Sequence, residues 1–77
     1  MTGDIAQSAN GIAIVVNGEW LQPDNPSLAH LLYARGIIDA RGVAVAINGA
    51  ILPQEQWPNQ RLKAGDRVEI VKVMVGG

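Results

Sequence analysis

Cysteine is absent from this sequence, and histidine occurs once, as His30. The absence of cysteine excludes disulfide bridges, a thiol nucleophile, iron–sulfur clusters and cysteine-based zinc sites. A single histidine leaves little for any other tight transition-metal site, so we expect no bound metal or cofactor. The stability of the fold must therefore come from packing.

An excess of charge and long apolar runs are also lacking. Six basic and seven acidic side chains give a formal net charge of -1, which provides no electrostatic basis for binding nucleic acids. The longest apolar runs, residues 12–16 and 43–47, fall far short of the roughly 20 residues of a membrane helix. Residues 1–11 contain no lysine or arginine, unlike a secretory signal. We therefore expect a cytoplasmic protein with no nucleic-acid or membrane partner.

The sequence does contain enough apolar residues for one small hydrophobic core. Hydrophobic residues make up 48% of 77 positions, and two separate cores would each be too small to fold unassisted. Residues 1–11 mix small and polar residues without a period, which predicts a flexible N-terminal extension. Residues 12–77 are expected to form a single domain with an extended tail.

The first half of this domain predicts a hairpin followed by a helix. Alternating apolar residues over 12–16 precede Asn17-Gly18, a dipeptide that suits a type I′ turn, and residues 19–22 form the returning strand. After two prolines, Ser27 is placed to cap a helix over residues 28–35. Gly36 stands where a left-handed residue ends a helix, with Ile37 available for a Schellman contact.

The second half predicts three further strands. Residues 42–47 are apolar on both faces, as in an interior strand, and a second Asn-Gly pair at 48–49 turns the chain into a short return over 50–52. Residues 53–60 contain two prolines and many polar side chains, which predicts irregular structure. The final strand is expected over 67–73.

This order of elements predicts an α+β fold, a mixed sheet packed on one main helix. It is the β-grasp, or ubiquitin-like, architecture. A connection through a helix produces parallel strands, so the architecture places the first and last strands side by side and parallel.

Candidate catalytic residues do not form a catalytic group. His30 lies in the first turn of the predicted helix without a second histidine or a nucleophile, and Glu19, Glu55 and Glu69 lie on separate elements. The glycines match neither a dinucleotide-binding nor a P-loop pattern. We therefore expect a protein that is not an enzyme.

The final dipeptide, Gly76-Gly77, is the feature that carries chemistry. Residues 74–77, if extended, reach about 13 Å beyond the last strand, and two glycines have no side chains to obstruct entry into a narrow channel. The terminal carboxylate is ionised at neutral pH and needs no base to attack a phosphate. A partner enzyme would have to supply ATP, magnesium and positive charge.

A family resemblance covers residues 12–77 and depends on an ordered set of segments. These are 16–19, 27–32, 42–49, Pro53, Trp57, 62–71 and Gly76-Gly77. Together they closely resemble the ThiS family, the sulfur carriers of thiamin biosynthesis. The resemblance implies that Gly77 is adenylated by a ThiF-like adenylyltransferase and converted to a thiocarboxylate, and that Gly76 allows the tail to thread. It also implies a sulfur donor such as a cysteine desulfurase system and a ThiG-like thiazole synthase that uses the sulfur.

Other functions of the same fold stay open at this point. The small subunit of molybdopterin synthase also ends in Gly-Gly, although that family commonly has prolines just before its tail and residues 71–75 contain none. A ubiquitin-like modifier joined to lysines of other proteins, or an interaction module with an idle tail, would share the fold.

The last strand raises a separate question. Val68 and Ile70 share one face, whereas Val71, Val73 and Val75 occupy the other. A bulge or burial on both faces would explain this pattern, and we favour that interpretation. The alternative is that Val73, Met74 and Val75 dock the adenylating partner. Trp57 is expected to close the edge of the core rather than bind a ligand.

Overall fold

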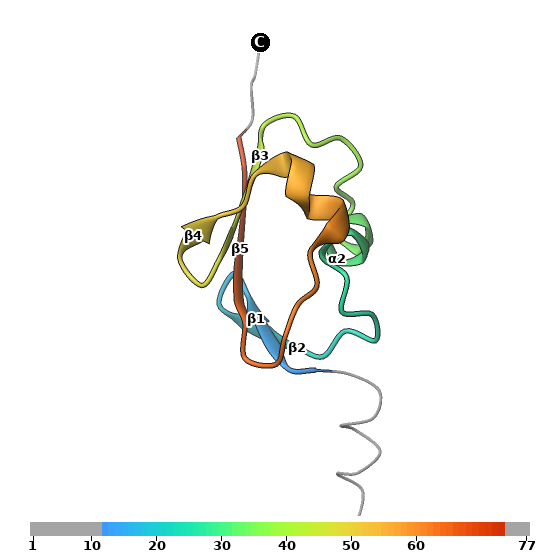
Figure 1. The fold of residues 1–77 in the computed structure, drawn as a ribbon, viewed down its shortest axis with the longest axis vertical. Helices are drawn as coiled ribbons and strands as arrows, with labels where there is room; N and C mark the ends of the chain where they lie inside the picture. Colours follow the sequence, from blue (N-terminus) through green and yellow to red (C-terminus); the bar gives the residue numbers. More distant parts are fainter. Residues whose placement is uncertain (1–11, 74–77) are drawn as a thin grey trace, which may run out of the picture.

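The computed structural model describes residues 12–73 of the chain. A five-stranded sheet in the order β2-β1-β5-β3-β4 lies beside one α-helix and one 3-10 helix (Figure 1). The strands are β1 (Ile14–Val16), β2 (Glu19–Leu21), β3 (Val43–Ile47), β4 (Ala50–Ile51) and β5 (Arg67–Lys72), and the helices are α2 (Leu28–Ala34) and η1 (Gln54–Asn59).

The topology confirms the predicted architecture. β5 is the central strand, parallel to β1 on one side and antiparallel to β3 on the other. The parallel pair consists of the first and last strands, as expected. The apolar run predicted over residues 42–47 forms the interior strand β3, which begins at Val43 because Gly42 lies in a turn.

Both predicted hairpin turns are present. Asn17 and Gly18 have φ values of 49° and 84°, and Asn48 and Gly49 have 53° and 87°, so all four adopt the positive φ of type I′ turns. The Asn17 side chain also extends the ladder between β1 and β5. Its Oδ1 accepts from the Ile70 amide at 2.8 Å, and its Nδ2 donates to the Ile70 carbonyl at 3.2 Å.

The helix α2 begins and ends with the predicted caps. The Ser27 hydroxyl accepts from the His30 amide at 3.3 Å. At the other end, Gly36 has a φ of 83°, its amide donates to the Tyr33 carbonyl, and the Ile37 amide donates to the Leu32 carbonyl, both at 2.9 Å. These two bonds form the Schellman motif. The helix ends at Ala34, one residue before the predicted end, because Arg35 is the cap.

The segment after β4 is more regular than predicted. Residues 53–60 were expected to be irregular, but the 3-10 helix η1 spans Gln54–Asn59 and follows Pro53 in extended conformation. Trp57 is buried, and its Nε1 donates to the Leu52 carbonyl at 3.0 Å. This bond satisfies the polar end of the indole while its rings close the core, which confirms the packing role.

The core lies between the sheet and the two helices. Its buried side chains are almost all aliphatic and come from every element except β2 and β4: Ile14, Val16, Leu28, Leu31, Leu32, Val43, Val45, Trp57, Leu62, Val68 and Ile70. Among residues 12–73 no polar or charged residue is buried. The core of residues 12–73 is therefore built from hydrophobic side chains alone.

Candidate tail base and docking face

The described structure ends where the predicted functional tail begins. Met74, Val75, Gly76 and Gly77 lie outside the described residues, and Val73 is the last position whose surroundings are defined. β5 ends at Lys72, one residue earlier than predicted. The candidate site is therefore the surface around Val73, from which the tail departs.

Val73 is held in place by a backbone contact with Gly42. The Val73 amide donates to the Gly42 carbonyl at 2.7 Å. Gly42 has a φ of 73°, and a Cβ at this position would lie 3.0 Å from the Val73 carbonyl oxygen. The left-handed conformation favours glycine, and the close approach leaves little room for a side chain at this position. The origin of the tail is thus fixed by a residue far away in the sequence.

The side chains of β5 divide cleanly between the two faces of the sheet. Val68 is fully buried and Ile70 nearly so, whereas Val71 and Val73 are 56% and 60% exposed. The register between β3 and β5 advances one residue at a time, from Val43 opposite Lys72 to Ile47 opposite Val68. The favoured interpretation, a bulge or burial on both faces, is therefore wrong. Val71 and Val73 are instead on a face that no element of residues 12–73 covers.

We call this surface the open face and define it by Val15, Trp20, Arg67, Glu69, Val71 and Val73. Cross-strand pairing places Val15 beside both Trp20 and Arg67, and Trp20 is 66% exposed. A shallow groove of about 610 Å³ runs between Trp20 and Val71. Exposed apolar side chains that gather on one face mark an interaction surface more often than apolar residues scattered singly over the surface. Trp20 lies on β2 at one edge of the sheet, and the sequence pattern alone indicates no role for it.

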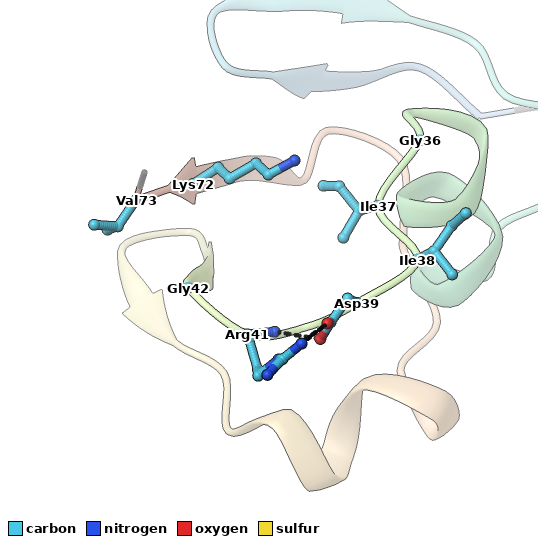
Figure 2. Close-up of a pocket in the computed structure, with 8 residues that line it drawn as sticks. All are labelled: Gly36, Ile37, Ile38, Asp39, Arg41, Gly42, Lys72 and Val73. Atoms are coloured by element: carbon cyan, nitrogen blue, oxygen red, sulfur yellow. Dashed lines mark hydrogen bonds and ion pairs between the residues drawn. The ribbon is translucent and has the colours of Figure 1, made fainter. Parts of the chain in front are cut away.

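A second groove lies on the other side of β5, beside the tail base (Figure 2). It holds about 590 Å³ between the end of β5 and the loop that joins α2 to β3, and its lining includes Ile37, Ile38, Arg41 and Lys72. Figure 2 shows the Lys72 side chain pointing toward Ile37, and Val73 lines the end of the groove next to Lys72. We call it the tail-base groove.

The electrostatics of the tail-base groove are simple. Arg41 donates two hydrogen bonds from its guanidinium to Asp39 Oδ2, at 3.0 and 2.8 Å, and its amide donates to Asp39 Oδ1 at 3.0 Å. These side-chain bonds, followed by the backbone bond, lower the pKa of Asp39 below its ordinary value of 3.8. Within residues 12–73 this is the one ion pair, and Lys72 has no acidic partner there.

Conventional catalytic features do not occur in the described part of the chain. His30 is exposed on α2. No group of three or more histidine, aspartate or glutamate side chains in residues 12–73 could hold a metal ion. The helices of the same region are too short to cross a membrane.

Comparison with known proteins identifies the family. The sequence model of the ThiS family matches residues 19–77 of the chain. The chain belongs to the ThiS family. This confirms the resemblance seen in the sequence, and the match includes the tail positions that the described structure does not reach.

Two relatives support the ThiS assignment. The sulfur carrier protein ThiS of Escherichia coli (strain K12) is 42% identical over 36 residues, which cover 47% of this chain and 54% of that protein. The match thus spans about half the length of this curated relative. The crystal structure of a thiamine biosynthesis protein (ThiS) from Geobacter metallireducens aligns with a TM-score of 0.69 and 32% identity, over 86% of this chain and all of that one. The β-grasp fold is confirmed by this neighbour.

Proposed function

We propose that this chain is a sulfur carrier for the thiazole moiety of thiamin and that its reactive group is the α-carboxylate of Gly77. The observation that supports this most directly is the ThiS family match, which extends through Gly76 and Gly77. The printed names of the relatives, a sulfur carrier protein and a thiamine biosynthesis protein, support the same class. In this function the protein is a substrate and a donor rather than an enzyme, and the predicted cytoplasmic location stays a prediction.

The chemistry takes place on the tail and uses partner enzymes. On a ThiF-like adenylyltransferase, a carboxylate oxygen of Gly77 attacks the α-phosphorus of ATP, and magnesium pyrophosphate leaves. The terminal sulfur of a persulfide, supplied by a donor such as a cysteine desulfurase system, then attacks the acyl carbon and displaces AMP. A thiol cleaves the sulfur–sulfur bond of the resulting acyl disulfide, which releases the thiocarboxylate and leaves the thiol oxidised in a disulfide. The resulting thiocarboxylate delivers sulfur to a ThiG-like thiazole synthase. Because the carboxylate is already ionised at neutral pH, no base from residues 12–73 is required.

The described residues contribute placement and recognition. The bond between Val73 and Gly42 fixes where the tail leaves the domain, and Gly76 adds no side chain that would block a channel. Val73, with Met74 and Val75, forms the proposed docking patch for the adenylating partner. The exposure of Val71 and Val73 on the open face supports this patch and extends it along β5.

Intact mass spectrometry tests the proposal. Protein isolated from thiamin-starved cells is expected to include a form heavier by the difference between sulfur and oxygen, and this difference should map to Gly77. Deletion of Gly77, or addition of one alanine after it, should abolish both the heavier form and growth without thiamin. A matched chain with an alanine inserted within residues 1–11 should keep both.

The outcomes separate the alternative functions. A ubiquitin-like modifier would instead produce ladders on larger proteins, and an interaction module would produce neither signal. Growth of the Gly77 deletion strain without thiamin, or a requirement for the chain in molybdopterin synthesis alone, would contradict the proposed function.

A further inference from the structure

We propose that the tail-base groove seats the channel rim of the adenylating enzyme, with an apolar rim side chain against Ile38 and a rim carboxylate against Lys72. This inference rests on the proposed function, because it concerns how the enzyme that receives Gly77 recognises the domain. It assigns a docking role to the loop between α2 and β3, a segment to which the proposed tail chemistry gives no part.

The length of the tail forces contact at this place. Residues 74–77 span at most about 13 Å when fully extended. An active site that encloses Gly77 must therefore bring the mouth of its channel close to Val73. The open face and the tail-base groove lie on opposite sides of β5, and Val73 lies at the boundary between them. A rim that surrounds the departing chain meets both sides, so the groove is covered along with the open face.

The groove is apolar where a partner side chain would enter. Ile38 is 85% exposed, the highest fraction among the large exposed hydrophobic residues of 12–73. Ile37, beside it, is half-buried and packs against the core. This large aliphatic side chain lies at the mouth of a groove of about 590 Å³, and its burial by a partner would give a favourable free energy. Apolar side chains of this kind supply affinity at the centres of interfaces.

The loop is held in its shape before any partner binds. The Ala40 carbonyl accepts from the Val43 amide at 3.1 Å and from Gln54 Nε2 at 3.0 Å. Asp39 and Arg41 add the side-chain and backbone bonds described above. Because these bonds fix the loop in the free domain, docking costs little conformational entropy. Ile38 is thus presented on a preformed surface.

The charge of the groove defines the complementary group on the partner. Asp39 and Arg41 neutralise each other at 2.8 Å, so the uncompensated charge of the groove lining is the ammonium of Lys72. An exposed lysine at the edge of an interface attracts a carboxylate and raises the association rate in a salt-dependent way. The partner surface therefore carries an acidic residue next to its apolar one.

The test measures ATP–pyrophosphate exchange by the ThiF-like adenylyltransferase of the same organism, with the full-length chain as substrate. Ile38→Asp and Lys72→Glu are each expected to lower kcat/KM for the carrier by roughly ten-fold or more, mainly through KM. Lys72→Arg should stay close to the unaltered chain. Added salt should raise the KM of the enzyme for the unaltered chain. It should also reduce the difference in kcat/KM between the unaltered chain and Lys72→Glu.

Lys63→Glu is the matched charge-reversal control. Lys63 is exposed in the turn before β5, at the other end of that strand from Val73, and its reversal should leave exchange unchanged. Circular dichroism and thermal unfolding should show that Ile38→Asp and Lys72→Glu remain folded, since both side chains are exposed.

The outcomes distinguish this inference from the proposed function. If the unaltered chain supports no exchange, the proposed function fails and the inference fails with it. If the unaltered chain is active and both variants match it, the groove is not a docking site for this enzyme. Normal exchange with a loss of only the later sulfur transfer also overturns the inference, because the occupant would then be the sulfur-accepting enzyme.

Discussion

The two faces of the sheet are built from the same strands but have opposite relations to solvent. The covered face carries aliphatic side chains that α2 and η1 seal from water, such as Val45 and Val68, both fully buried. The open face carries Trp20 and Val71, which nothing in residues 12–73 covers. Apolar residues are thus buried on one face and exposed to solvent on the other, where we propose that they serve recognition. Hydrophobicity alone does not separate these two uses.

Substitution by aspartate at two positions of β5 should give the largest difference in stability between the two faces of the sheet. Val68→Asp places a carboxylate in the core with no partner, which costs several kcal/mol, and a domain of this size has only about 5 kcal/mol of stability to lose. We expect loss of cooperative urea unfolding for Val68→Asp. Val71→Asp, on the open face, should shift the unfolding free energy by no more than about 0.5 kcal/mol. Equal effects of the two substitutions would contradict the division of faces.

The register of β5 determines which residues belong to which face, and Asn17 helps to hold it. Asn17→Gly keeps the positive φ of the turn but removes both side-chain bonds to Ile70. We expect a loss of roughly 1–3 kcal/mol in urea unfolding, because the Ile70 amide and carbonyl lose their partners. Asn48→Gly, in the other hairpin, is a useful comparison because its side chain bonds the exposed end of β5. It should cost less.

The proposed docking role of the open face predicts a loss of binding without a loss of folding. Val73→Asp should weaken the complex with the adenylating partner about ten-fold, equivalent to about 1.4 kcal/mol, while the thermal midpoint stays close to that of the unaltered chain. A titration by isothermal calorimetry measures the affinity. An unaltered affinity would remove Val73 from the docking patch.

The smallest expected effect concerns the ion pair at the edge of the tail-base groove. Arg41→Ala removes the side-chain bonds that lower the pKa of Asp39, so this pKa should return toward 3.8, measured by NMR titration of the carboxyl carbon. The folded-state pKa is lowered, so the pairing stabilises the loop at pH values above the ordinary pKa. This contribution is lost as the pH falls through the lowered value. At neutral pH both chains should unfold at nearly the same urea concentration.

Much of the fold was predictable because its signals are local. A positive φ at Asn17-Gly18, the hydroxyl of Ser27 and the left-handed Gly36 each act within a few residues, so their chemistry is visible in the sequence. The 3-10 helix at Gln54–Asn59 was missed because prolines usually interrupt regular structure. Pro53 in extended conformation before the first turn and the buried Trp57 allow a short helix there.

The candidate site was predictable only in part. The family was predicted from the sequence and is confirmed, whereas the roles of Gly76 and Gly77 in the tail and of Val73 in docking stay predictions. Trp20 and the tail-base groove were missed because they depend on strands and loops that meet only in the folded chain. Trp20 and Val71 line the same groove because β2 pairs with β1 and β1 pairs with β5.

The sequence by itself determined the turns, the helix caps, the aliphatic composition of the core and the two glycines at positions 76 and 77. Only the tertiary structure decided that Val71 and Val73 face solvent and that Gly42 anchors the origin of the tail. The physical reason is that turns and caps depend on the conformational preferences of single residues. Burial and docking surfaces depend instead on contacts between residues far apart in the chain, such as the 2.7 Å bond from Val73 to Gly42.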